Sequence, residues 1–280
     1  TFCARFEKPI VQDEDANAVR RLNQFTGPFI LRRMKSEVLR ELPPKTENVR
    51  SVELETEQRK LYLAAVVDAR EKLRAAKPED KMTVFAVLMR LREICCDPRL
   101  VADNWTGSSA KLEACLELVT EAVAGGHRIL LFSQFTSMLE LLAKRLDEAG
   151  VSHFTLQGST PKPVRAEQVR RFNQGEADVF LISLRAGGTG LNLTAADIVI
   201  HYDPWWNLAA QNQATDRAYR IGQRNPVQVY RLIAQDTIEE KIVELQQAKQ
   251  SLADTVTGGA DGAILSMNPE QLLQLLGEEA

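Results

Sequence analysis

The sequence predicts an α/β fold in which a mostly parallel sheet carries helices on both faces. From about residue 108 onward, short runs of β-branched and aliphatic residues alternate with amphipathic helical segments, and this alternation is typical of strands joined by crossover helices. The apolar runs lack polar alternation, which indicates strands that are buried on both faces, as in a parallel sheet. The strands are expected at residues 128–135, 153–158, 177–184, 196–202 and 227–234.

Residues 1 to about 107 follow a different pattern. A β-like stretch at 46–54 follows the rigid turn sequence LPPK, and two helical stretches at about 56–76 and 81–96 are separated by the turn sequence KPED. We therefore expect a helical appendage on the α/β body. The predicted regions are a linker with the leading segment over 1–45, a strand with a helical protrusion over 46–107, the α/β body over 108–235, and a brace helix with a carboxy-terminal tail over 236–280.

Helix starts are marked by residues that can cap free backbone amides. The pairs Ser137–Glu140 and Thr237–Glu240 have the spacing of capping boxes, and Asn268 precedes a proline at the first turn of a short tail helix. This leucine-rich tail helix could dock a partner, but packing on its own domain is the favoured interpretation.

Composition limits the class of protein. The net charge of −3 gives no overall basic field, so any nucleic-acid site must be a local patch. The four cysteines form no C-x-x-C pair, which favours reduced core thiols. The three histidines are scattered, and no metal site is expected. No apolar run approaches the roughly 20 residues of a transmembrane helix, so we expect a cytoplasmic protein, nucleoid-associated if bacterial, with no membrane partner.

The sequence lacks the motifs that hold and hydrolyse a nucleotide. There is no G-x-x-x-x-G-K-[ST] loop, and the acidic run DEDA at 13–16 lies in a polar stretch and not at the end of an apolar strand. The glycine-rich loop RAGGTGLNL at 185–193 lies between two buried strands. Such a loop is either an ordinary tight connection or a backbone cradle for a phosphate.

The segment QATDRAYRIGQ at 213–223 carries two arginines. In a helix, Gln213, Arg217 and Arg220 would share one face. On spacing alone, the favoured interpretation is a surface pair between Asp216 and Arg220 with Arg217 solvated. The alternative is that both arginines neutralise a transferring γ-phosphoryl group held by another domain.

The segment QATDRAYRIGQ closely resembles the sixth helicase motif of the Swi/Snf-type ATPases, a DNA-translocating branch of the superfamily-two helicases. Other motifs of that family appear in the same order and cover nearly the whole chain, and the form DPWWN resembles the bacterial branch. These motifs are FILRRMKSEV (29–38), LPPK (42–45), LREICCDPRL (91–100), LLFSQFTSML (130–139), GST (158–160), FN (172–173), LISLRAGGTGLNLTAADIVIHYDPWWN (181–207) and VQVYRLIAQDTIEEKI (227–242).

The resemblance implies that two RecA-like lobes close over ATP with magnesium. This chain would be the second lobe, and the first lobe, with the Walker motifs, would precede Thr1, so the isolated fragment is expected to be inactive. By motif position, Arg217 and Arg220 would be the catalytic arginine fingers. Gly188 would face the nucleotide, and Gln213 would position the motif against the first lobe.

The resemblance also implies a track for double-stranded DNA. Trp206 matches a tryptophan that couples hydrolysis to movement, although a core or interface aromatic is the alternative. The residues expected to contact the phosphates of one strand are Ser133, Gln134, Ser159, Thr160 and Arg185.

We therefore expect the second motor lobe of an ATP-dependent double-stranded-DNA translocase. Two alternatives remain open: a catalytically inert nucleic-acid-binding or regulatory module of the same fold, and a lobe of an RNA helicase. The expected partners are double-stranded DNA and the first lobe of the same parent chain. No residue pattern identifies a protein substrate.

Overall fold

The computed structural model describes residues 5–6, 15–26, 42–184, 186, 190–253 and 267–277. The range Leu42–Gln247 forms one compact unit with the described tail residues, and helix α2 (Ala16–Thr26) belongs to a second unit. The following description concerns the first of these units, which carries the sheet.

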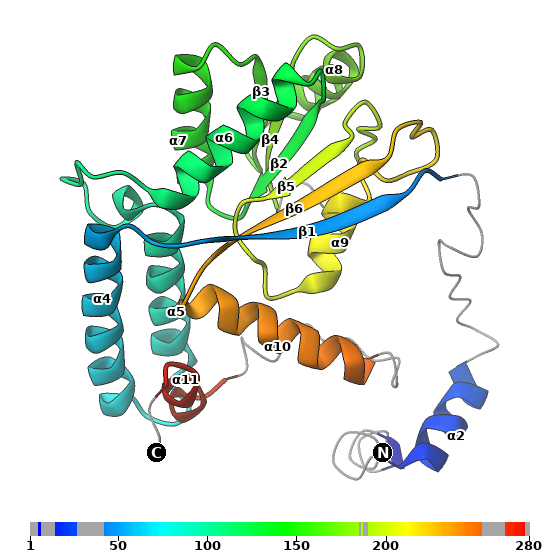
Figure 1. Cartoon of the computed structure of the whole chain (residues 1–280). Helices are drawn as coiled ribbons and strands as arrows, with labels where there is room; N and C mark the ends of the chain where they lie inside the picture. Colours follow the sequence, from blue (N-terminus) through cyan, green and yellow to red (C-terminus); the bar gives the residue numbers. More distant parts are fainter. Residues whose placement is uncertain are drawn as a thin grey trace. The chain divides into compact units, whose positions relative to one another are not determined.

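The sheet contains six strands in the order β1-β6-β5-β2-β4-β3, and every pair is parallel (Figure 1). The five strands expected from the apolar runs are all present, which confirms the predicted fold class. The strands are β1 (Lys45–Val52), β2 (Ile129–Ser133), β3 (His153–Leu156), β4 (Val179–Ser183), β5 (Ile198–His201) and β6 (Val227–Ala234).

Strand β1 is the β-like stretch that the sequence predicted at 46–54. It was grouped with the helical protrusion in the predicted region 46–107, and in the structure it pairs with β6 from Lys45↔Val227 to Val52↔Ala234 and forms one edge of the sheet. Most of its residues are exposed, so its sequence lacks the apolar run of a buried strand. Instead of an apolar cross-strand contact, β1 and β6 share a salt bridge, in which Oε2 of Glu47 lies 2.5 Å from Nη2 of Arg231.

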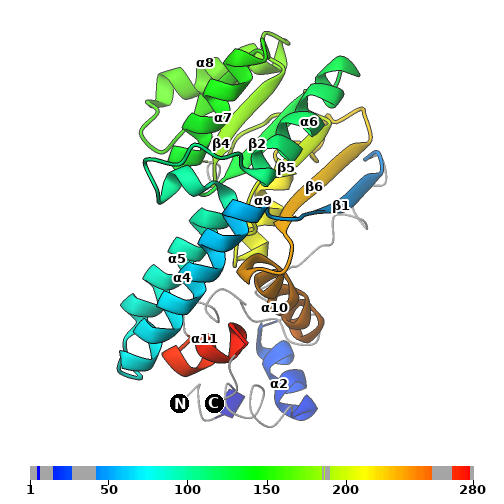
Figure 2. The same cartoon turned by 60° about the vertical axis from the view of Figure 1, so that its left-hand side comes forward.

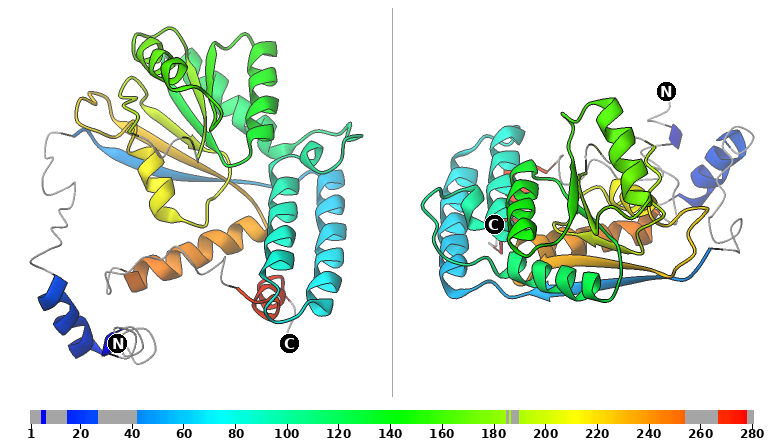
Figure 3. Two further views of the ribbon diagram at one scale, coloured as in Figure 1. Left: turned by 180° about the vertical axis from the view of Figure 1, so that it is seen from behind. Right: turned by 90° about the horizontal axis from the view of Figure 1, so that it is seen from above.

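Helices cover both faces of the sheet, as predicted (Figure 3). Helices α6 (Ala110–Ala124) and α7 (Thr136–Glu148) pack on the face that includes Leu131 of β2. Helices α8 (Lys162–Asn173) and α9 (Leu208–Thr215) contribute to the core on the opposite face, with Phe132 of β2. Successive residues of one strand therefore enter opposite cores, which requires the uninterrupted apolar runs seen in the sequence.

The helical protrusion is a hairpin of α4 (Thr56–Ala75) and α5 (Lys81–Cys96), which extends away from the sheet (Figure 2). The short helix η2 (Pro98–Leu100) follows it. Helices α10 (Ile238–Ala253) and α11 (Pro269–Leu275) share a hydrophobic cluster with the hairpin, in which Leu272 is fully buried. The tail helix therefore packs on its own unit, as the favoured interpretation stated.

The predicted caps and cysteine environments hold only in part. Asn268 forms the capping box of α11 with Gln271. The box predicted at Ser137 is wrong, because α7 begins at Thr136 after the buried Phe135, with no side-chain cap. At α10, the amide of Asp236 donates to Glu240, so Thr237 does not complete a box with that residue.

Three cysteines are free and buried, as predicted: Cys95, Cys96 and Cys115. Cys3 lies outside the described residues.

Candidate functional site

The carboxyl ends of the parallel strands meet at one edge of the sheet, where ligands of α/β proteins usually bind. Polar side chains end three neighbouring strands there: Ser133 ends β2, Ser183 ends β4 and His201 ends β5. The amide of Ala186 donates to Ser183 Oγ over 3.3 Å, which anchors the start of the glycine-rich loop.

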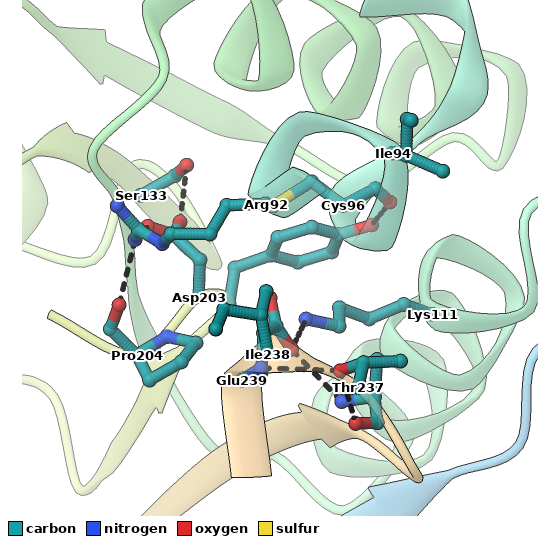
Figure 4. A network of polar contacts seen from close by, with 12 residues as sticks. Arg92, Ile94, Cys96, Lys111, Ser133, Asp203, Pro204, Thr237, Ile238 and Glu239 are labelled. Atoms are coloured by element: carbon teal, nitrogen blue, oxygen red, sulfur yellow. Dashed lines mark hydrogen bonds and ion pairs between the residues drawn. The ribbon is translucent and has the colours of Figure 1, made fainter. Parts of the chain in front are cut away.

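Asp203 is the centre of a buried polar network at this edge (Figure 4). Ser133 Oγ donates to its Oδ1 over 2.6 Å, and the amide of Gln134 donates to the same oxygen over 3.2 Å. Arg92, from helix α5 of the protrusion, donates from Nη2 to Asp203 Oδ2 over 3.1 Å and to the carbonyl of Pro204 over 2.6 Å. Burial raises the pKa of Asp203, although Arg92 and Ser133 favour its ionised form. One carboxylate therefore joins the protrusion, strand β2 and the loop after β5.

Aromatic rings surround the guanidinium of Arg92. Its Cζ lies 4.7 Å from the ring centre of Trp206, 5.4 Å from that of Phe135 and 6.0 Å from that of Trp205. Trp206 also forms an edge contact with Phe85 at 6.0 Å. Cation–π contacts of this kind are strongest where water is excluded. Trp206 is therefore held against the protrusion.

A second buried ion pair lies between Lys111 of α6 and Glu239 of α10, and neither side chain is exposed (Figure 4). Burial opposes the charge of Lys111, but the carboxylate of Glu239 together with Cys96 and Cys95 more than offsets this, so the pKa of Lys111 is raised. Glu239 also accepts from the amide of Ala234 at the end of β6, over 2.8 Å. Nearby, Tyr202 donates its hydroxyl to the carbonyl of Cys96, over 2.9 Å. The protrusion is thus fastened to the sheet by buried polar contacts.

Helix α9 ends at Thr215, which corrects the predicted helix through residues 213–223. Thr215 Oγ1 lies 2.9 Å from Nε2 of His201, a hydrogen bond that fixes the end of the helix to strand β5. The His201 ring stacks on Phe132. Burial and the charge of Arg231 lower the pKa of His201 to about 3, so its imidazole is neutral.

Arg217 and Arg220 therefore lie in a turn and not on a helix face. We call residues 216–223 the arginine turn. Arg217 is only 7% exposed, and its Nε has no hydrogen-bond partner in the described structure. Burial and the neighbouring Arg220 lower the pKa of Arg217, although Asp216 partly offsets this. Arg220 is exposed.

Neither guanidinium forms an ion pair within the part of the chain that the structure describes. The surface pair favoured on spacing alone, between Asp216 and Arg220, is therefore absent there. Two cations therefore lie close together with no salt bridge among the described residues, although Asp216 is near enough to favour the charged form of Arg217. This arrangement suits an anion with several oxygen atoms, such as a phosphate.

The residues predicted to contact DNA lie in different environments. Ser133 is fully buried and donates to Asp203, so its hydroxyl does not reach the surface. Gln134 is half-buried, with its amide directed at the sulfur of Met89 over 3.4 Å. Ser159 is exposed, and Thr160 is half-buried and accepts from a backbone amide. Of these four residues, Ser159 is exposed at the surface, whereas the hydroxyl of Ser133 is directed at Asp203.

The remaining candidates are Arg185, Gly188 and Gln213. Arg185 and Gly188 lie outside the described residues. Gln213 is exposed on α9.

Among the described residues, there is no group of three or more histidine, cysteine or acidic side chains that could hold a metal ion. None of the described helices has the length and apolar character to cross a membrane.

Sequence reasoning missed the buried charges that organise this edge. Arg92 and Asp203 are 111 positions apart, and Lys111 and Glu239 are 128 apart. The available signal was a charged residue within an apolar helical face, such as Arg92 in LMRLREICC, because such a residue needs a buried partner.

Two domain families match the chain. The SNF2-related domain matches residues 1–100, and the helicase conserved C-terminal domain matches residues 110–222. An uncharacterized ATP-dependent helicase of Mycoplasma pneumoniae is 38% identical over 275 residues, which are 98% of this chain and 26% of that protein. The putative ATP-dependent helicase/translocase YwqA of Bacillus subtilis is 38% identical over 283 residues, 98% of this chain and 31% of that protein. The chain thus spans about a quarter to a third of these relatives.

Solved structures share the fold. The SWI2/SNF2 ATPase core domain of Sulfolobus solfataricus aligns with a TM-score of 0.72 and 31% identity, over 100% of this chain and 58% of that one. The same core in complex with double-stranded DNA aligns with a TM-score of 0.71 and 30% identity, over 100% of this chain and 60% of that one. The six-stranded parallel sheet is therefore the RecA-like fold of these ATPases.

Proposed function

Because the chain belongs to the Swi/Snf family of ATP-dependent helicases and translocases, we propose that it is the second motor lobe of a translocase that moves on double-stranded DNA. In this proposal, a first lobe of the same parent polypeptide holds ATP and magnesium. The second lobe supplies the arginine turn and part of the DNA track. Closing and reopening of the two lobes shifts their phosphate contacts in alternation.

The observation that carries this proposal is the pair of arginines that form no salt bridge among the described residues. Arg217 is nearly buried, its Nε has no hydrogen-bond partner and, unlike Arg92, it forms no salt bridge among the described residues, so an anion from outside would stabilise it. Arg220 is exposed beside it and is free to reach across to a second lobe. A γ-phosphoryl group has the charge and the oxygen atoms to bind both.

The DNA side of the proposal divides into direct and indirect contacts. Ser159 and Thr160 would contact phosphates, together with Arg185 and Gln134. Ser133 would act through Asp203, which holds the amide after it. Such contacts position the protein on a duplex without reading its sequence.

Trp206 would transmit movement between the protrusion and the DNA track. It lies against Arg92 of the protrusion and begins the segment that leads into α9. Gly188 would face the nucleotide, and Gln213, exposed on α9, would contact the first lobe.

The test uses the parent polypeptide with both lobes. Arg220→Ala should lower DNA-stimulated ATP hydrolysis by about a thousandfold or more. Binding of ATP should change little, because the first lobe holds the nucleotide. The matched control is Arg224→Ala, which removes another exposed arginine four positions later and should leave turnover near that of the unchanged protein.

Two results would overturn the proposal. One is unchanged turnover in Arg220→Ala. The other is hydrolysis by the isolated chain in proportion to its concentration after stringent purification, since the proposal places the nucleotide in the other lobe. Stimulation of the parent by duplex DNA, single strands and RNA separates the alternatives: an RNA helicase responds to RNA, and an inert module responds to none.

A further inference from the structure

We propose that Gln223 is a positioning residue that holds Arg217 and Arg220 in their productive geometry. This inference rests on the proposed arginine-finger function. Gln223 ends the arginine turn and is 7% exposed.

The side-chain amide of Gln223 makes four hydrogen bonds. Its Nε2 donates to the carbonyl of Ala196 over 2.7 Å and to the carbonyl of Ala218 over 3.2 Å. Its Oε1 accepts from the amides of Arg224, over 2.8 Å, and Asn225, over 2.9 Å. Both donor hydrogens and both acceptor lone pairs are used, which is the full capacity of the group. A glutamine in this state fixes four backbone positions at once.

The arginine turn needs such a support because it has no regular secondary structure. Helix α9 ends at Thr215, so the turn lacks the continuous hydrogen-bond ladder of a helix. Gly222 adopts a φ of +103°, which prevents a right-handed helix from continuing. The side-chain amide of Gln223 provides some of the hydrogen bonds that a continuous helix would have provided. One of these bonds goes to the carbonyl of Ala218, which lies between the two arginines in the sequence.

The same contacts tie the arginine turn to the segment that follows the glycine-rich loop. The amide of Leu193 donates to the carbonyl of Arg217 over 3.0 Å, and Gln223 reaches Ala196 in the same segment. On the other side, Asn173 Nδ2 donates to the carbonyl of Asn192 over 2.8 Å. Residues 190–196 are therefore held between two side-chain amides. A displacement of this segment would be transmitted to the arginines through Gln223.

The chain contains a matched glutamine in a purely structural setting. Gln58 is fully buried in the protrusion, donates from Nε2 to the carbonyl of Ile94 over 2.9 Å and accepts from the amide of Ala110 over 3.2 Å. Replacement of either glutamine by methionine keeps the size of the side chain and removes its polar bonds. The hydrogen bonds of Gln223 hold the arginine turn, whereas those of Gln58 hold the protrusion against the start of α6.

The first measurement compares Gln223→Met with Gln58→Met in the parent polypeptide with both lobes. Both should lower the melting temperature, because each leaves buried backbone groups without partners. Only Gln223→Met should lower the kcat of DNA-stimulated ATP hydrolysis, by about tenfold to a hundredfold, since misplacement of a catalytic group by about 1 Å has effects of this size. The KM for ATP should stay within about twofold. Equal kcat values in the two variants would overturn the inference.

The second measurement asks whether Gln223 acts through Arg220. In an Arg220→Lys background, which keeps the charge and loses the planar fork, Gln223→Met should lower kcat by less than about threefold. A loss as large as in the unchanged background would mean that Gln223 acts independently of Arg220 and would also overturn the inference. Failure of the proposed function is distinct, because in that case Arg220→Ala itself leaves turnover intact, and the inference then falls with it.

Discussion

Two regions of the molecule hold buried or nearly buried charge, and they differ in whether the fold neutralises it. At the base of the protrusion, Arg92 pairs with Asp203 and Lys111 pairs with Glu239, and all four side chains are inaccessible. In the arginine turn, Arg217 is 7% exposed and has no ion pair within the described structure. The same residue type, arginine, thus forms an ion pair with an internal carboxylate in one region and forms none among the described residues in the other, although Nε and Nη1 of Arg92 also lack hydrogen-bond partners.

Under the proposed function, this difference distinguishes structural charges from functional ones. A buried ion with an internal partner is retained because removal of either partner leaves an uncompensated charge in the interior. A nearly buried cation that forms no salt bridge lowers stability, and under the proposed function a phosphate bound in the working complex would compensate for it. The comparison therefore makes opposite predictions for the two regions.

The largest expected effect on stability is at the buried ion pair. Lys111→Met should lower the free energy of unfolding by about 3–5 kcal/mol, because Glu239 is left buried without its partner. Urea unfolding followed by circular dichroism measures the loss. The matched control is Lys72→Met, which removes an exposed pair with Asp68 and should cost about 0.3–0.5 kcal/mol. If both variants lost a similarly small free energy of unfolding, the buried Lys111–Glu239 pair would not be a structural charge pair.

An intermediate effect is expected from His201, which joins strand β5 to the end of α9 just before the arginine turn. Its pKa is about 3 in the folded chain and about 6.5 when unfolded. The unfolded chain therefore binds a proton that the folded chain does not, and stability falls as the pH drops below 6.5. Between pH 7 and pH 5 the loss should be about 2 kcal/mol.

Urea unfolding at several pH values measures this contribution. His201→Gln removes the titrating group and keeps an amide that can bond to Thr215, so the loss between pH 7 and pH 5 should shrink by the same amount. A variant that keeps the full pH dependence would show that His201 is not the cause.

The smallest effect on stability is expected at Arg217. Arg217→Met should change the free energy of unfolding by less than about 1 kcal/mol, because no described carboxylate forms a salt bridge with Arg217 and none would be left buried without its partner. Arg92→Met, also a change of a buried arginine, should cost several times more, about 3–5 kcal/mol, since Asp203 then remains buried alone. Thermal and urea unfolding of both variants test this. A loss above about 2 kcal/mol in Arg217→Met would assign Arg217 to the structural group.

The sequence was sufficient to predict the elements whose signal is local. The apolar runs of β2, β4, β5 and β6 and the two protrusion helices lie close to their predicted positions, because burial on both faces or along one stripe imposes a period on consecutive residues. The arginine segment was identified through its resemblance to a helicase motif, since the residues themselves were compatible with a surface pair.

Tertiary structure decided the features that depend on residues far apart in the chain. Strand β1 joined the sheet because β6 offered an unpaired edge, although its own residues are mostly polar. Helix α9 ended at Thr215, and contacts from Gln223 shaped the arginine turn that follows. The buried pairs joined positions more than a hundred residues apart. Local periodicity carries no information about such partners, because a charge finds its counter-ion only after the layers have packed.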